Sequence, residues 1–172
     1  ENQTLAYKNA SIILEQAALR ETRALMSVAD VVGKNDNSSK KIAAMVERLK
    51  ANKKVLMDDV DAYYMFKNNT SKTPKIELSA QELAASKKIP KNNPDLDAYF
   101  GNRRGGAPGV SIHSTMRMEV FNFVNGKRSY YDIYKAVLAE ILAAGNWYYG
   151  TITLDEVEKL LDANVASGAL SL

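Results

Sequence analysis

The strongest constraint on the fold is a stretch from Leu5 to Val32 that contains neither glycine nor proline. Within it, apolar residues recur three and four positions apart, which is the spacing of residues on one face of an α-helix. Gly33 follows directly and suits the left-handed position that often comes just after the end of a helix. The sequence therefore predicts one long amino-terminal helix that ends at Gly33.

A second helix is predicted from about Lys40 to Phe66. It follows a polar turn, residues 33–39, in which Ser38 or Ser39 would serve as the N-cap. Its apolar residues form a stripe close to a heptad repeat: Ile42, Met45, Val46, Leu49, Leu56, Val60 and Tyr63. Two long helices joined by a short turn pack antiparallel, so residues 1–67 are expected to form a helical hairpin.

The first helix is apolar on two sides. Its broad side comprises Ile13, Leu14, Ala17, Ala18, Ala24, Leu25, Val28, Val31 and Val32. The opposite side has a narrow stripe of residues one heptad apart, Leu5, Ile12, Leu19 and Met26. A helix that is apolar on two sides is usually covered on both. We expect the broad side to face the hairpin partner and the narrow stripe to be a seam, either within the chain or at an interface.

Residues 68–110 contain all four prolines and four of the nine glycines, and are expected to form an irregular connector with short helical turns. One such turn begins at Ser79, which forms a capping-box pattern with Glu82, and another covers residues 94–100. The same connector contains a glycine-rich loop, residues 101–109, with Arg103 and Arg104. We expect an interface role for these two arginines, and whether the loop binds an anion stays open.

The last part of the chain, residues 111–172, has a regular order of predicted elements. A helix over 116–126 is followed by a helix from Ser129 to Gly145, an extended segment over 147–154, and a helix that Thr153 caps together with Glu156. Gly168 would end that last helix. This order predicts a small winged-helix-like unit. The predicted fold class is therefore mainly α, a long antiparallel helical hairpin plus a winged-helix-like helical unit.

Charge and composition restrict the function. The net charge is only +3, with basic segments at 34–54 and 68–110. The helix that would enter a DNA groove is acidic, with Asp155, Glu156, Glu158 and Asp162 against one Lys159. A groove-reading helix needs the opposite sign, so no nucleic-acid partner is expected. No stretch approaches 18 apolar residues, the length expected of a membrane span.

The residues that build catalytic and metal sites are scarce. The chain has no cysteine and one histidine, His113, which has no partner at zinc-ligand spacing. The sequence also lacks the nucleophile elbow that Ser-His-Asp chemistry requires. No catalytic, cofactor-binding or metal-binding residue is therefore predicted in this chain.

Three stretches resemble a known region: residues 14–28, 121–140 and 147–170. The last two carry the phrases FVNGKRS and WYYG, each followed by a helical pattern. They resemble the non-catalytic carboxyl-terminal region of secreted bacterial zinc aminopeptidases of metallopeptidase family twenty-eight. In that family the two zinc ions are bound by a separate amino-terminal domain, so the resemblance carries no ligand over to this chain.

The resemblance implies an accessory region of a larger enzyme, located in the periplasm or outside the cell. The start of the chain has neither an initiator methionine nor the pattern of a signal peptide, and this also leads us to expect a segment of something longer. Its expected partner is the catalytic domain of the same polypeptide or a second protomer. The alternative is a free-standing helical interaction or DNA-binding module. The parent's substrate, the role of the region and the oligomeric state do not follow from the sequence.

Overall fold

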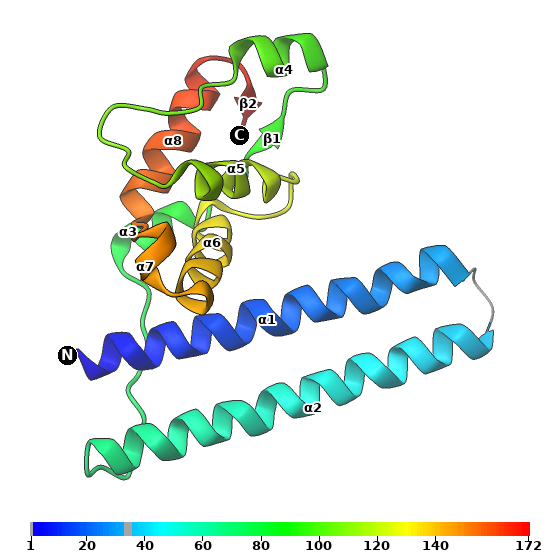
Figure 1. The fold of residues 1–172 in the computed structure, drawn as a ribbon, viewed down its shortest axis with the longest axis vertical. Coiled ribbons are helices and arrows are strands. Elements are labelled where there is room, and N and C mark those ends of the chain that lie inside the picture. Colours follow the sequence, from blue (N-terminus) through cyan, green and yellow to red (C-terminus); the bar gives the residue numbers. More distant parts are fainter. Residues whose placement is uncertain (1, 33–35) are drawn as a thin grey trace. The chain divides into compact units, whose positions relative to one another are not determined.

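The computed structural model describes residues 2–32 and 36–172 and is mainly helical (Figure 1). The chain divides into two compact units, Glu1–Ile76 and Glu77–Leu172. Residues 77–110, which we expected to be part of a connector, belong to the second unit. Their backbone is tied to it by hydrogen bonds from the Tyr130 amide to the Lys88 carbonyl, 2.9 Å, and from the Gly126 amide to the Pro90 carbonyl, 3.2 Å.

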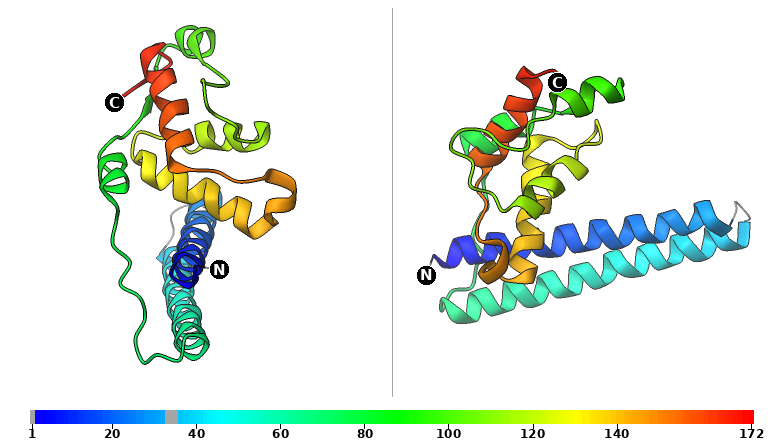
Figure 2. Two further views of the ribbon diagram at one scale, coloured as in Figure 1. Left: turned by 90° about the vertical axis from the view of Figure 1, so that its left-hand side faces the viewer. Right: turned by 45° about the horizontal axis from the view of Figure 1, so that its top comes forward.

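The first unit contains the predicted hairpin. Helix α1, Gln3–Val32, and helix α2, Asp36–Lys67, run antiparallel and side by side in every view (Figures 1 and 2). Helix α2 begins at Asp36, so the prediction that Ser38 or Ser39 would be its N-cap is wrong, because both lie inside its first turn. The predicted helix end at Gly33 lies outside the described residues.

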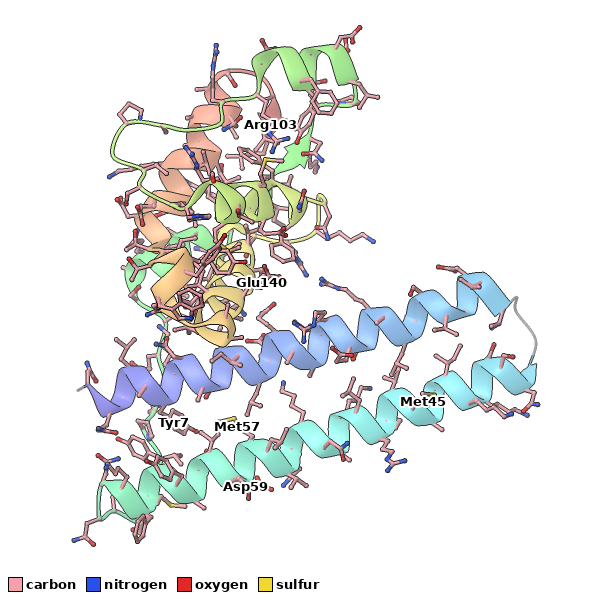
Figure 3. The ribbon with its side chains drawn as sticks, viewed as in Figure 1. Tyr7, Met45, Met57, Asp59, Arg103 and Glu140 are labelled. Carbon is pink, nitrogen blue, oxygen red and sulfur yellow. The ribbon has the colours of Figure 1, made fainter. Side chains whose placement is uncertain are left out.

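The seam between the two helices is set by an aromatic pair. The rings of Tyr7 and Tyr64 meet edge to face, with centroids 5.2 Å apart. Figure 3 shows Tyr7 and Met57 in the space between the helices. Along α2, the row that contains Tyr64 is the one partly or fully buried: Ile42, Val46, Leu49, Lys53, Met57, Val60 and Tyr64. Between Ile42 and Val60 all residues outside this row are exposed, so this row faces α1.

The second unit contains the other six helices and the two strands that the structure describes. These elements are α3 (Ala80–Ala85), β1 (Lys91–Asn92), α4 (Leu96–Asn102), α5 (Ser114–Asn122), α6 (Tyr130–Ala144), α7 (Asn146–Tyr149), α8 (Leu154–Ala166) and β2 (Leu170–Ser171). The strands pair antiparallel, with Lys91 opposite Ser171 and Asn92 opposite Leu170. Most of the core comes from α6 and α8, through Tyr130, Ile133, Val137, Ile141, Val157, Leu160 and Leu161.

The caps predicted in the second unit are confirmed. Ser79, Ser129 and Thr153 each form a capping box, with Glu82, Asp132 and Glu156 respectively. These boxes fix where three of the helices begin because the cap side chain and the third helical residue satisfy each other's backbone amides.

Two predicted elements differ. The helix expected over 116–126 ends at Asn122, since the Asn125 side chain accepts hydrogen bonds from the Lys127 and Arg128 amides and turns the chain. The extended segment expected over 147–154 begins instead with the helical turn α7, and the glycines on either side of that turn, Gly145 and Gly150, both have positive φ. In the described part of the chain, no helix combines the length and apolar character needed to cross a bilayer.

Candidate functional site

A second row of apolar side chains on α2 does not face α1. Met45, Leu56 and Tyr63 belong to the stripe predicted from the sequence, yet they are 52%, 50% and 65% exposed. They lie about 80° around the helix from the buried row, as the 100° step per residue requires. The predicted stripe therefore divides into a seam row and an exposed row.

The broad apolar side of α1 divides in the same way. Leu14, Ala18 and Leu25 lie on the row of Tyr7 and face α2. Val32 lies on that row too, one heptad after Leu25. The other members belong to a neighbouring row, which Ala6 and Ala10 extend toward the amino terminus of the helix: Ala6, Ala10, Ile13, Ala17, Ala24, Val28 and Val31. In an antiparallel pair this row and the exposed row of α2 point to the same side of the hairpin. We call the two rows together the hairpin face.

A groove of about 470 Å³ lies in the hairpin face, near the open end of the hairpin. Its walls come from both helices and include Ala6, Ala10 and Ile13 of α1 and Leu56, Val60 and Tyr63 of α2. The groove forms because Tyr7 and Tyr64 hold the helices apart, while the alanines beside them fill little space. It is open and mainly apolar, which suits side chains from another protein.

The hydroxyl of Tyr7, beside the groove, has a hydrogen-bond partner within the hairpin. The Tyr7 hydroxyl donates a 2.7 Å hydrogen bond to the Asp61 carboxylate. Burial raises the pKa of Tyr7, and the hydrogen bond and charge of Asp61 raise it further. Asp59, on the rim of the groove, is exposed (Figure 3).

The narrow stripe of α1 is not uniform. Ile12 is buried, at 5% exposure, whereas Leu19, Leu5 and Met26 are 40%, 52% and 55% exposed. Three of its four residues therefore remain open to solvent, and the structure gives no continuous seam along it.

The two arginines of the glycine-rich loop are anchored within the second unit. The Arg103 guanidinium lies over the Phe121 ring, 4.2 Å from its centroid. The Arg104 amide donates to the Asn164 side-chain oxygen, 2.8 Å, and the Asn164 amide donates back to the Arg104 carbonyl, 3.0 Å. Since Asn164 is fully buried, this reciprocal pair pins the loop to α8. The side chain of Arg103 is thus engaged, and that of Arg104 is exposed.

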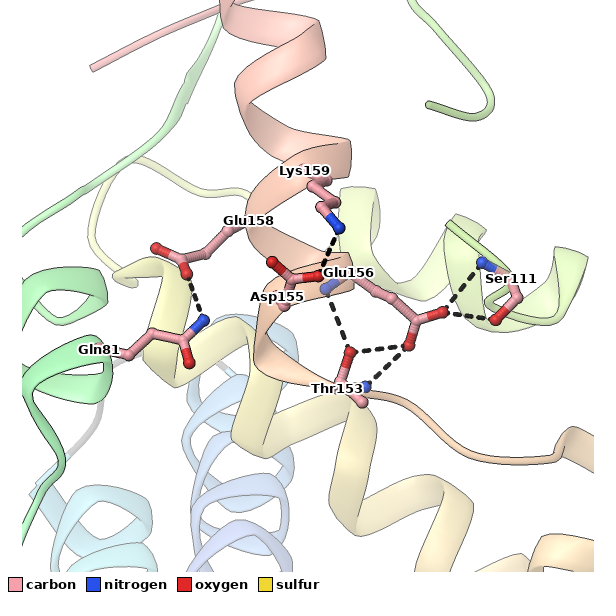
Figure 4. A network of polar contacts seen from close by, with 7 residues as sticks. All are labelled: Gln81, Ser111, Thr153, Asp155, Glu156, Glu158 and Lys159. Carbon is pink, nitrogen blue, oxygen red and sulfur yellow. Dashed lines mark hydrogen bonds and ion pairs between the residues drawn. The ribbon is translucent and has the colours of Figure 1, made fainter. Parts of the chain in front are cut away.

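The acidic end of α8 has a structural network. Glu156 accepts hydrogen bonds from the amide and hydroxyl of Thr153, 3.0 and 2.9 Å, and from those of Ser111, 2.9 and 2.6 Å (Figure 4). Burial alone would raise the pKa of Glu156, but the hydrogen bonds from Ser111 and Thr153 outweigh it and lower the pKa. The capping box was visible in the sequence, whereas the Ser111 contact was not.

An aromatic cluster in the second unit escaped the sequence analysis. The His113 ring lies near those of Tyr148 and Tyr149, with centroids 5.7 and 5.5 Å away, and Trp147 beside them is largely exposed. His113 also caps α5, where its Nδ1 accepts from the Thr115 amide at 3.3 Å. The ring of His113 thus has a structural role at the start of α5.

Comparison with known proteins gives no match to a family model, a curated protein or a solved structure. Within residues 2–32 and 36–172, no three His, Asp or Glu side chains gather in a way that could hold a metal ion. The groove and the exposed apolar side chains make the hairpin face the candidate site with the best support from the geometry.

The sequence did contain a signal for the hairpin face. Met45, Leu56 and Tyr63 are separated by 11 and 7 residues, a spacing that returns to the same side of a helix. The seam row, from Ile42 to Tyr64, has spacings of three and four residues instead. Two apolar rows on one helix predict two contacts, but the predicted stripe combined them into one.

Proposed function

We propose that this chain is a non-catalytic interaction module, and that the hairpin face docks on helices of a partner protein. The observation that carries the proposal is the exposed apolar row of α2, Met45, Leu56 and Tyr63, beside the apolar row of α1. Isolated large apolar side chains are common on surfaces, but aligned rows on two adjacent helices form a continuous patch, which is typical of a protein interface.

The energetics of the hairpin support the same proposal. In the described part of the hairpin, Ile12 and Ile42 are the large apolar side chains that are buried, at 5% and 7% exposure. Helices in proteins are stabilised mainly by packing of their apolar faces, and two helices alone bury little. Covering the hairpin face would bury Leu56, Tyr63 and Val28 and supply the missing packing.

The wider setting of the module is proposed from the sequence resemblance alone. In this proposal the module belongs to a larger secreted zinc-dependent aminopeptidase, located in the periplasm or outside the cell, and the catalytic domain or a second protomer covers the hairpin face. The phrases FVNGKRS and WYYG, in residues 121–129 and 147–150, are what support it.

The test uses a photo-crosslinking amino acid at position 56, with position 55 as the matched control. Leu56 lies on the hairpin face, whereas Val55, similarly exposed, points away from both α1 and the face. Irradiation in extracts of the source organism should give a protein adduct from position 56 and none from position 55. The adduct is identified by mass spectrometry, and the identified protein, once purified, should lose its affinity for the Ile13→Glu variant. Equal labelling from both positions, or affinity unchanged by Ile13→Glu, would contradict the proposal.

A further inference from the structure

We infer that the occupant of the hairpin face is a second copy of this chain, and that two hairpins pack face to face as an antiparallel four-helix bundle. This inference rests on the proposed function and names the partner. It is carried by three observations: the distribution of charge along α2, the symmetry of the apolar rows, and the area of the face.

The charges of α2 are segregated along its length. Residues 40–54 contain six Lys or Arg and one Glu, whereas residues 55–66 contain three Asp and no base, with Lys67 following as the last residue of the helix. Helix α1 does not neutralise the basic half, because residues 17–31, which lie opposite it, carry two bases and two acids. Of these, Arg20 and Glu21 pair with each other at 3.2 Å. An antiparallel copy of α2 would place the acidic half of one chain beside the basic half of the other.

Part of the apolar row of α1 has the symmetry that an antiparallel copy requires. Reversal about Ala17 exchanges Ala10 with Ala24 and Ala6 with Val28, all of them apolar, whereas Ile13 and Val31 of the same row exchange with Glu21 and Gln3. Small side chains at and around the centre would let two α1 helices approach closely. An isologous contact needs this kind of self-complementary surface, because each residue meets its own symmetry mate.

The same axis relates residues of the exposed row of α2 to one another, except that Leu56 meets Asn52 of the second copy. In the hairpin Tyr7 lies opposite Tyr64, so Ala17 lies opposite residue 54 in the antiparallel register. Reversal of α2 about residue 54 sets Met45 against Tyr63 of the second copy. It also sets Arg48 within one residue of Asp59 of the second copy, on the same flank of the face. The axis that pairs the alanines of α1 therefore also pairs Met45 with Tyr63 on α2.

The hairpin face is large enough to form a stable dimer interface. A 30-residue helix is about 45 Å long, and two helices side by side give a face roughly 20 Å wide. Two such faces bury roughly 1,800 Å², which is within the range of stable protein interfaces.

The experiment measures the mass of the purified full chain by sedimentation equilibrium and uses charge reversal at the proposed intermolecular pair. The unmodified chain should form a dimer. Asp59→Lys sets a lysine against Arg48, and Arg48→Glu sets a glutamate against Asp59, so each variant should dimerise at least about tenfold more weakly. The double variant restores opposite charges and should dimerise within about threefold of the unmodified chain. An equimolar mixture of the two single variants should form a heterodimer. One of its two symmetry-related contacts then joins the original Arg48 and Asp59, and the other joins the two substituted residues, so opposite charges meet at both.

Asp58→Lys is the matched control. It makes the same charge change at the adjacent position, but Asp58 points away from the hairpin face and pairs with Lys54 at 2.8 Å. Its dimerisation should equal that of the unmodified chain. Circular dichroism of every variant checks that the helix content is unchanged.

The outcomes separate this inference from the proposed function. An interface of this area should give mostly dimer at about 100 µM. If the chain is still a monomer at that concentration, a second copy does not occupy the hairpin face. Equal effects of Asp58→Lys and Asp59→Lys, or no recovery in the double variant, also overturn it. In these cases the proposed function stands if position 56 crosslinks to a different protein. A dimer that Leu56→Glu leaves intact would contradict the hairpin face itself, and with it both proposals.

Discussion

At the scale of single residues, buried polar side chains fix the loops of the second unit. Glu156 joins the start of α8 to Ser111, and Asn164 joins its end to the glycine-rich loop at Arg104. Each of these two side chains forms several hydrogen bonds with backbone groups in place of hydrogen bonds with water. Removing such a group leaves buried donors unpaired, which costs more than the bonds contribute on average.

Glu156→Gln is expected to lower the free energy of unfolding by about 1–3 kcal/mol, because the amide can no longer accept at both oxygens from Ser111 and Thr153. Chemical denaturation measures the change. Asp155→Asn is the control, as Asp155 is exposed and pairs with Lys159 one turn away, so its loss should have little effect. An equal loss in both variants would show that the helix dipole, and not the network, is responsible.

The same network predicts a pH dependence. The pKa of Glu156 is below its ordinary value of 4.5 in the folded chain, so the ionised carboxylate stabilises the fold. That contribution is complete above pH 4.5 and is lost as the pH falls through the folded-state pKa. The difference in stability between the unmodified chain and Glu156→Gln should therefore be constant near neutrality and shrink in acid. A difference that stays constant well below the ordinary pKa of a glutamate would contradict the assignment.

Asn164→Ala should free the glycine-rich loop, because the Arg104 amide and carbonyl both lose their partner. We expect a stability loss of about 2–3 kcal/mol and faster trypsin cleavage after Arg103 and Arg104. Ser167→Ala, which removes a half-buried hydroxyl from the same end of α8, should leave the cleavage rate unchanged. Unchanged cleavage in Asn164→Ala would mean that other contacts hold the loop.

At the scale of the elements, the buried row of α2 contains one charged residue. Lys53 lies in the buried row of α2, between Leu49 and Met57, and is less exposed than both of its chain neighbours. Its aliphatic part can pack at the seam, but the ammonium group must reach water. The seam is therefore not optimal for the stability of the hairpin at this position.

Lys53→Leu is expected to stabilise the hairpin by about 1 kcal/mol, since a buried apolar side chain replaces a charged one. Lys54→Leu is the control: Lys54 is exposed and pairs with Asp58, so its replacement should leave stability nearly unchanged. Thermal unfolding followed by circular dichroism compares the two. A gain at position 54 and none at 53 would show that the seam register is wrong.

At the scale of the whole molecule, the two units differ in how they are stabilised. The second has a continuous core over α6 and α8, in which Ile133, Val137 and Leu160 are completely buried. The hairpin has mostly half-buried contacts. We therefore expect Glu77–Leu172 to fold alone and the stability of the hairpin to depend on what covers its face.

A fragment of residues 77–172 should unfold cooperatively at a temperature independent of protein concentration. In the full chain, amide hydrogen exchange in α1 and α2 should slow as the concentration rises from about 5 to about 100 µM, because association protects the hairpin. Exchange in α6 and α8 serves as the internal control and should not change. A fragment without cooperative unfolding would mean that the second unit needs the hairpin.

The sequence by itself determined the features that depend on neighbours along the chain. The glycine-free stretch from Leu5 to Val32, and the cap patterns at Ser79, Ser129 and Thr153, predicted where helices form, because helical spacing and capping are local. Residues 147–149 were the exception. Their aromatic side chains have β propensity, but contact with His113 and two positive-φ glycines favour a helical turn.

Only the tertiary structure decided which side of each helix is covered. The rows of Met45 and Val46 are both apolar, and nothing local distinguishes a row that meets α1 from one left open. The choice follows from the register in which Tyr7 meets Tyr64, a contact between residues 57 positions apart. Residues 77–110 belong to the second unit for the same reason. The hydrogen bonds that hold them join Lys88 to Tyr130 and Arg104 to Asn164, residues much later in the chain. Burial and register are properties of pairs of elements, and a single segment carries only half of that information.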